Sequence, residues 1–197
     1  MFANRRQLFV RQHAGLLKLT SSYDIIDPAN GQVIGAAKEV PPTWAKYLRL
    51  VVNKAMLPTM VEVSETGTSG PAVALHRNAG IFSKRVRVTS GTGAELGYFQ
   101  SKTFSLGGAL KLHDTNGRLL GEVKGDWKGW NFKMLDTQGR ELGVITKKWA
   151  GIGKELFTTA DQYAISLSEA AASNSGLCTL LLAAGLAVDL VFKESSN

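Results

Sequence analysis

The chain has few features that would tie it to a covalent framework or a lipid anchor. Its one cysteine, Cys178, excludes a disulfide within the chain and lies in an apolar run, where we expect a small buried side chain. No continuous apolar stretch follows the early arginines, which argues against a secretory signal. Phe2 stands where myristoylation requires glycine, and the C-terminal ESSN is not a prenylation box. We therefore expect a cytoplasmic protein, with peripheral association with a membrane left open.

Catalytic and metal-binding patterns are also missing. His13, His76 and His113 each stand alone in strand-like or turn-like sequence, without metal-ligand spacing. There is no G-x-S-x-G motif, and the glycine-rich stretch at 151–154 lacks the length and the helix of a phosphate-binding loop. We therefore expect no covalent chemistry and assign no catalytic residue.

The composition is that of one folded domain with an excess of basic residues. Hydrophobic residues make up 44% of the chain and charged residues 20%, as in ordinary globular proteins. A chain of 197 residues can bury one sizeable core, so we expect a single domain over residues 1–197. The formal net charge of +7 favours phospholipid headgroups, phosphoinositides or nucleic acid as partners, although a solvated basic surface without a partner is the alternative.

A repeated hairpin pattern fills much of the chain. A strand-like run ends in a polar turn that contains a glycine, and a second glycine follows four positions later, after three intervening residues, within the next strand. The glycine pairs are Gly31 and Gly35, Gly93 and Gly97, Gly117 and Gly121, and Gly139 and Gly143. The turn glycines suit tight hairpins, and the second glycines predict bends, bulges or close packing. Alternation in the flanks, as in Val86 and Val88 against Arg85 and Arg87, predicts half-buried strands, about twelve in all.

Residues 43–56 break this pattern and predict a helix that follows Pro41–Pro42 and is capped by Thr43. Its apolar stripe contains Trp44, Tyr47, Leu48, Val51 and Ala55, and its polar side contains Lys46, Arg49, Asn53 and Lys54. One interpretation is a helix that covers a barrel end with its apolar stripe. The other is a basic amphipathic helix that enters a lipid interface, with Trp44 and Tyr47 at the membrane boundary.

Gly176–Phe192 is the one long apolar run, and it contains a single acid, Asp189. A segment that is apolar on every side must be surrounded by protein or by lipid. As a helix it is about 26 Å long, slightly short of a hydrocarbon core of ~30 Å, so a membrane span is not excluded. Alternatively it is the plug of a barrel. About twelve tilted strands enclose a space roughly 24 Å across, which one helix with interdigitating side chains fills.

Residues 147–165 contain a specific motif. In order, it comprises Lys147, Trp149, Gly151, Glu155, Phe157, Thr158, Ala160, Asp161, Tyr163 and Ile165. This motif resembles the phospholipid scramblase family pattern K-x-W-x-G-x-x-x-E-x-F-T-D-A-D-x-F-x-I. The stretches Tyr23–Ile25, Leu96–Tyr98 and Val188–Glu194 are also similar to that family, so the resemblance covers about residues 7–194.

The resemblance extends to a wider superfamily that includes the LURP-one-related and tubby C-terminal domains. It implies a mainly β fold, a closed antiparallel barrel of about twelve strands around a central hydrophobic helix, here over residues 174–192. The sequence itself adds a helical insertion at 41–58. It therefore favours the plug over the span. It also implies that Asp189 lies near the barrel mouth, within reach of water or a basic partner.

The resemblance also indicates where calcium would bind, over residues 159–170. Of the acidic positions, Asp161 is retained, but Thr159 and Ala170 stand where the family has aspartates, and Glu169 is one position away. Calcium takes several oxygen ligands, so this set favours Asp161 as a turn residue without metal, and calcium stays open as a cofactor. The cysteine cluster that carries palmitate in many scramblases is absent, so we do not expect stable acyl anchoring.

Three functions follow as hypotheses. The first is a scramblase-like protein that associates with membranes and binds or redistributes phospholipids. Its candidate headgroup contacts are Lys46, Arg49, Lys54, Arg85, Arg87, Lys147, Lys148 and Lys154. The second is a tubby-like module that binds anionic lipid or phosphoinositide without transport. The third is nucleic-acid binding, in which Trp127, Trp130 and Trp149 would stack on bases unless they pack in the barrel wall.

Overall fold

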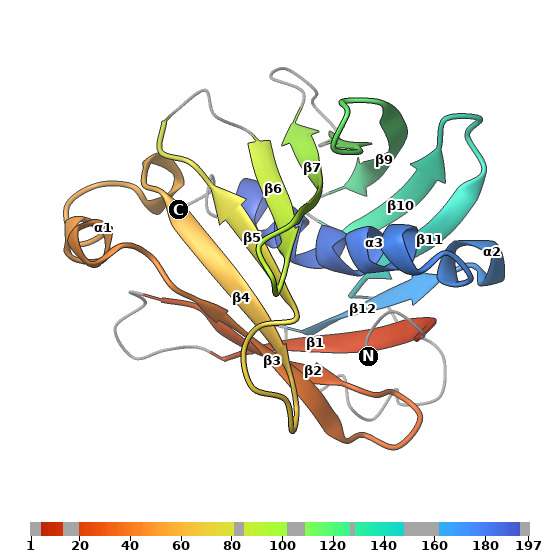
Figure 1. Ribbon diagram of the computed structural model, residues 1–197, viewed down its shortest axis with the longest axis horizontal. Helices are drawn as coiled ribbons and strands as arrows, with labels where there is room; N and C mark the ends of the chain where they lie inside the picture. The colour runs from red at the N-terminus through yellow and green to blue at the C-terminus, as the bar shows by residue number, and fades with distance from the viewer. Residues whose placement is uncertain are drawn as a thin grey trace.

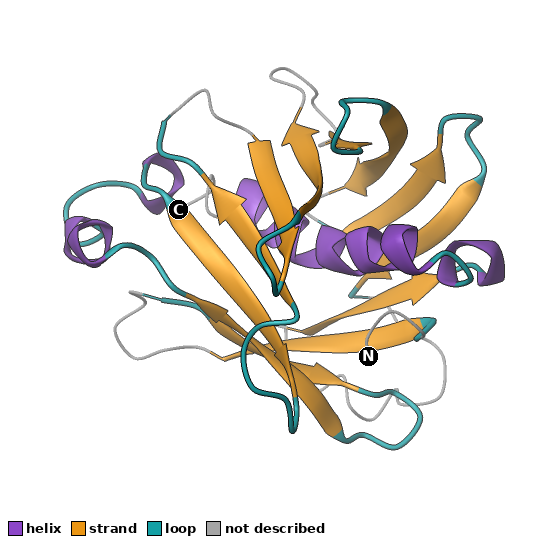
Figure 2. Ribbon diagram, in the orientation of Figure 1, coloured by secondary structure: helices purple, strands orange, loops and turns teal. Residues whose placement is uncertain are grey.

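Twelve antiparallel strands close into a barrel around the C-terminal helix (Figures 1 and 2), which confirms the predicted fold class. The computed structural model describes residues 5–13, 20–80, 85–101, 109–126, 129–147 and 162–193. The strands are β1 (Gln7–His13), β2 (Ser22–Ile26), β3 (Val33–Glu39), β4 (Thr59–Glu65), β5 (Val73–Arg77), β6 (Arg85–Ser90), β7 (Glu95–Ser101), β8 (Ala109–His113), β9 (Leu119–Asp126), β10 (Asn131–Asp136), β11 (Glu141–Thr146) and β12 (Gln162–Leu167).

Each strand pairs with its neighbours in sequence, and β1 pairs with β12 to close the barrel. Closure leaves no strand edge unpaired, so this run of hairpins does not need a covering layer at its edges. Alternation sets the two faces as predicted. In β6, Val86 and Val88 are completely buried against the interior, while Arg85 and Arg87 are exposed on the outer face.

The second glycine of each repeated pair marks an irregular, tightly packed point in the barrel wall. In the hairpins β6–β7, β8–β9 and β10–β11, the strand register shifts beside Gly97, Gly121 and Gly143 respectively. A Cβ atom at Gly121 would lie 2.2 Å from the carbonyl oxygen of Leu135 in β10, and one at Gly143 would lie 2.3 Å from that of Ser166 in β12. The expected bulges and close packing are therefore both present at these positions.

The apolar run lies inside the barrel, which confirms the plug (Figure 1). A short helix, α2 (Glu169–Ala172), leads to α3 (Ser175–Val188), whose first turn is capped by Asn174, which accepts a hydrogen bond of 3.0 Å from the Leu177 N–H. All residues of α3 from Leu180 onward are buried. The chain then continues as one π-helical turn, η4 (Asp189–Lys193). In the part of the chain that the structure describes, no helix combines the length and apolarity needed to cross a membrane.

The insertion between β3 and β4 is helical in two short pieces, α1 (Thr43–Leu48) and the 3₁₀ turn η2 (Lys54–Met56). The predicted continuous helix over 43–56 is therefore wrong, and so is Thr43 as its cap, because the N-cap is Pro42 and no side chain caps the helix. Hydrogen bonds from Leu50 N–H to Tyr47 and from Val51 N–H to Leu48 tighten the chain at this point. Val51, Val52 and Asn53 are weak helix formers, which agrees with the early end.

We expect the Gly121→Ala variant to lose about 3 kcal/mol of unfolding free energy, because the new methyl group would press on the backbone of β10. The matched control is Gly176→Ala in α3, where a Cβ atom would meet nothing closer than 3.7 Å and alanine favours the helix. Urea denaturation of both variants checks this. Equal stability of the two variants would contradict the packing argument.

Candidate functional site

Residues 41–58, here called the cover segment, turn their apolar side outward. Of the large hydrophobic side chains that the described residues expose, all but Val33 and Leu119 lie in or directly before this segment. Those in the segment, here called the apolar tip, are Trp44, Tyr47, Leu48, Leu50, Val51 and Met56. Tyr47 is 64% exposed, Leu50 68% and Val51 81%, whereas Ala45 is the one buried side chain of α1. The interpretation that the apolar stripe covers the barrel end is therefore wrong.

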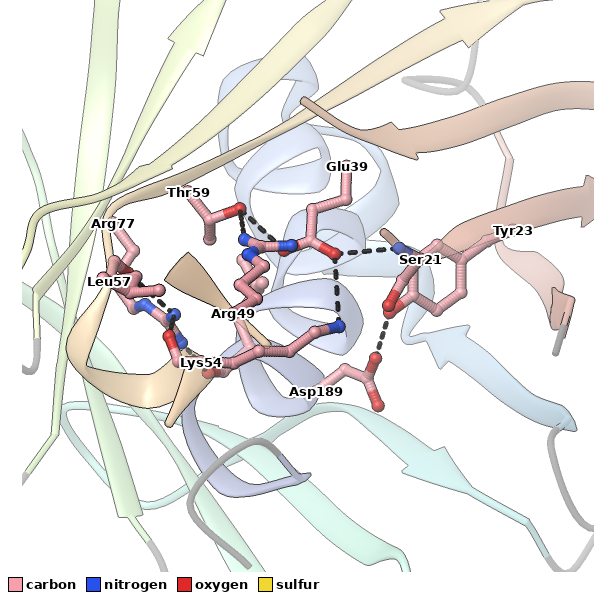
Figure 3. A network of polar contacts seen from close by, with 10 residues as sticks. Ser21, Tyr23, Glu39, Arg49, Lys54, Leu57, Thr59, Arg77 and Asp189 are labelled. Carbon is pink, nitrogen blue, oxygen red and sulfur yellow. Dashed lines mark hydrogen bonds and ion pairs between the residues drawn. The ribbon is translucent and has the colours of Figure 1, made fainter. Parts of the chain in front are cut away.

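Two residues on the polar side of the cover segment, Arg49 and Lys54, turn toward a buried carboxylate of the barrel, while Lys46 and Asn53 are exposed. Arg49 donates a hydrogen bond to the Glu39 carboxylate of β3 at 2.6 Å, and the two side chains are only 1% and 0% exposed (Figure 3). Thr59 of β4 lies between them. Its hydroxyl accepts from Arg49 at 2.9 Å and donates to Glu39 at 2.7 Å. The other carboxylate oxygen of Glu39 accepts from the Ser21 N–H at 2.8 Å and lies 3.9 Å from the Lys54 ammonium.

This arrangement keeps Glu39 ionised. Burial alone would raise the pKa of its carboxyl. The hydrogen bonds from Arg49 and Thr59 and the charges of Arg49 and Lys54 outweigh burial and hold that pKa below its usual range. Two of the predicted headgroup contacts, Arg49 and Lys54, thus already have an anionic partner within the protein, and Arg49 is not exposed.

Arg77, at the end of β5, joins the cover segment to the central helix. Its buried guanidinium donates to the carbonyl oxygen of Leu190 in η4 at 2.6 Å. It also donates to the carbonyl oxygens of Lys54 at 2.8 Å and of Leu57 at 3.2 Å (Figure 3). Carbonyl groups at a helix C-terminus carry partial negative charge and lack partners within the helix, so an arginine is well suited to this place.

Asp189 is buried, so the expectation that it lies within reach of water at the barrel mouth is wrong. It is 5% exposed and accepts a hydrogen bond from the hydroxyl of Tyr23 in β2 (Figure 3). Burial, followed by the nearby charge of Asp189, raises the pKa of Tyr23, and the same two causes raise that of Tyr163 in β12. The Tyr163 hydroxyl is buried and has no hydrogen-bond partner among the described residues. This end of the barrel therefore holds charges of both signs behind the cover segment.

A second polar site lies on the outer face of β6, β7 and β8. The Arg85 guanidinium lies 4.0 Å from the centre of the Tyr98 ring, and that ring stacks on His113 with centres 4.8 Å apart. Arg87 pairs across the strands with Tyr98 and, on its other side, with His76. Burial, followed by the charge of Arg87, lowers the pKa of His76. The sequence indicated the two arginines, but Tyr98 and His113 join them only through the strand register.

The other predicted residues are scattered. Lys46 is exposed on α1. Lys147 lies over the Trp130 ring at 4.8 Å, and Trp130, in the turn before β10, is half-buried and packs against the core. Ala170 lies on α2. Lys148, Lys154, Thr159 and Asp161, like Trp127 and Trp149, lie outside the described residues. Within the described ranges, no three His, Cys, Asp or Glu side chains are grouped to hold a metal ion.

We expect Arg49→Met to cost about 3–5 kcal/mol at pH 7, because it leaves the buried Glu39 carboxylate without its guanidinium. The lowered pKa of Glu39 means that the pair stabilises the protein above the pH at which an unfolded glutamate titrates, and that this contribution is lost as pH falls through the folded pKa. The difference from the wild type should therefore narrow below about pH 4. Urea denaturation of the wild type and the variant, at pH 7 and again below about pH 4, measures this difference in stability.

The control for this substitution is Arg87→Met, which alters an exposed arginine and should change stability little. If the difference in unfolding free energy between Arg49→Met and the wild type stayed constant with pH, it would contradict the assigned role of Glu39.

Comparison with known proteins gives two matches. Residues 122–195 match the family described as Scramblase. The matched range contains β10, β11, β12, the central helix and most of β9. An X-ray structure of a protein from Arabidopsis thaliana has the same fold, with a TM-score of 0.54 and 14% sequence identity over 97% of this chain and 92% of that one. No curated protein matches the sequence. The resemblance to the scramblase family is thereby confirmed, with residues 122–195 as the part of the chain that carries the family match.

Proposed function

We propose that the protein associates with membranes through the apolar tip and binds or redistributes phospholipids, without covalent chemistry. The exposure of the tip is the observation that carries this proposal. Complete burial of one large apolar side chain contributes about 1.5–3 kcal/mol, so several entering a lipid interface together provide substantial affinity. Trp44 and Tyr47 are of the residue types that favour the boundary between lipid and water.

Positive charge supports the same function. Lys46 is exposed beside the tip, and Arg85 and Arg87 are exposed on the barrel wall. Each cation held near an anionic membrane contributes about 1 kcal/mol. The scramblase family match directs the proposal toward phospholipid rather than toward another anion.

A second candidate function is a tubby-like module that binds anionic lipid or phosphoinositide without transport. The Arg85–Tyr98–His113 stack favours it, because the aromatic ring holds the guanidinium in place for a phosphate group. Nucleic-acid binding ranks third, since Trp130 packs against the core and Lys147 lies over its ring, which leaves less of it for a base.

For membrane association, we expect the double variant Leu50→Ser/Val51→Ser to lower the fraction of protein that floats with phosphatidylserine-containing vesicles by about tenfold. The matched control is Val33→Ser/Leu119→Ser, which removes the same two residue types from exposed positions outside the tip. The control should float like the wild type. Equal flotation of both variants and the wild type would exclude the tip as the membrane contact.

For lipid redistribution, we expect the reconstituted protein to speed the bleaching by dithionite of fluorescent phospholipid in the inner leaflet of liposomes, relative to protein-free liposomes. The assay is run with and without calcium, which also tests the cofactor. Flotation without faster bleaching under either condition would restrict the function to lipid binding.

A further inference from the structure

The cover segment supplies partners to two barrel residues that would otherwise have buried polar groups unsatisfied. Glu39 on β3 receives both of its cationic partners, Arg49 and Lys54, from this segment. Arg77 on β5 receives two carbonyl acceptors from it, those of Lys54 and Leu57. The barrel therefore presents one buried anion and one buried cation toward the segment, and the segment satisfies both.

These barrel groups are held in place independently of the cover segment. The Ser21 N–H and the Thr59 hydroxyl donate to opposite oxygens of the Glu39 carboxylate, so its position does not depend on Arg49 alone. The Leu190 carbonyl oxygen likewise holds Arg77. Figure 3 shows Glu39 and Arg77 on either side of Thr59, both facing the segment. A carboxylate and a guanidinium fixed in this way form a preorganised pair for a ligand that carries both charges.

The cover segment buries few apolar side chains. Among those that the structure describes, Ala45 and Leu57 are the buried hydrophobic ones, Val52 is half-buried, and the side chains of the apolar tip point outward. Its attachment is mainly polar, through Arg49 and through the carbonyl groups that bind Arg77. A lipid interface would bury the outward apolar side chains, and headgroups would replace the polar partners. The outward side chains can enter lipid in either position of the segment, so it is the replacement of the polar partners by headgroups that favours the lifted position.

We propose that membrane contact lifts the cover segment and that Glu39 and Arg77 then bind the ammonium and the phosphate of a zwitterionic phospholipid headgroup. In the closed form the Arg49 guanidinium occupies the place of the lipid ammonium. The carbonyl oxygens of Lys54 and Leu57 occupy the place of the lipid phosphate. This inference rests on the proposed membrane association and adds the site and the headgroup class.

The headgroup site is tested with monomeric dihexanoylphosphatidylcholine and dihexanoylphosphatidic acid, of which only the first carries an ammonium group. Both are titrated calorimetrically against the wild type and the Glu39→Gln variant. We expect the variant to lower the ratio of choline-lipid affinity to phosphatidic-acid affinity by about tenfold. The control is Glu62→Gln, a partly exposed glutamate on the outer face of β4, which should leave the ratio unchanged.

A purely structural role for Glu39 predicts a different result. Glutamine would weaken the hold on Arg49 and ease opening, so both lipids would bind more tightly and the affinity ratio would stay the same. That result overturns the headgroup site while leaving membrane association intact. Failure of the wild type to float with vesicles would instead remove the proposed function, and this inference with it.

Opening is tested by thiol modification in a Cys178→Ala background. Ala45→Cys places a thiol at the buried face of α1, and Ala37→Cys places one in the interior of the barrel; both alanines are fully buried. We expect phosphatidylcholine–phosphatidylserine vesicles to speed modification of Ala45→Cys by a charged maleimide about tenfold, while Ala37→Cys stays protected. Protection of Ala45→Cys on vesicles to which the protein is bound, or equal exposure of both thiols, would overturn the proposed lifting.

Discussion

The central helix is the constraint on which the rest of the structure depends. Its residues from Leu180 to Val188 are buried, so over this stretch no side of the helix faces water. Such a helix needs a closed wall around it, and a closed wall of twelve strands needs a filler of about this diameter. The two elements that are least stable alone, an apolar helix and a row of hairpins, therefore satisfy one another.

Enclosing the helix in the barrel also encloses the polar groups at its C-terminal end, which need partners there. The last turn leaves carbonyl groups without helical partners, and the acid Asp189 is buried near them. Arg77 binds one of these carbonyl groups, at Leu190, and Tyr23 donates to Asp189. Because Arg77 also binds the cover segment, the helix end, the wall and the segment form one polar network. The polarity that is excluded from the middle of the barrel is concentrated at this end.

The sequence predicted the parts of this structure that follow from periodicity. Alternation and the glycine pairs predicted the hairpins, and the all-round apolarity of residues 176–192 reduced the choice to span or plug. The Asp189 environment was not predictable in this way, since Tyr23 lies 166 positions away along the chain. Likewise, Tyr98 and His113 join Arg85 only through strand register.

The orientation of the cover segment shows most clearly what periodicity omits. The pattern of Trp44, Tyr47, Leu48 and Val51 indicates an apolar side but does not say which way that side faces. The deciding residue is Glu39, a buried carboxylate that draws Arg49 inward and so turns the apolar side outward. No local signal distinguishes a glutamate at the end of a strand that will be buried from one that will face solvent.

The energies that decide this orientation are comparable, which is the condition for a segment that moves. Separating Glu39 from Arg49 without a replacement partner costs about 3–5 kcal/mol. Burying the exposed parts of Trp44, Tyr47, Leu50 and Val51 in a lipid interface contributes about 3–9 kcal/mol, taking roughly half to three-quarters of the value for complete burial. This burial holds the segment at the membrane, but it is available to the closed form as well and does not open the segment by itself. In water the ion pair keeps the segment closed. At a membrane the ammonium and phosphate of a headgroup replace Arg49 and the carbonyl oxygens, and this exchange decides the position of the segment.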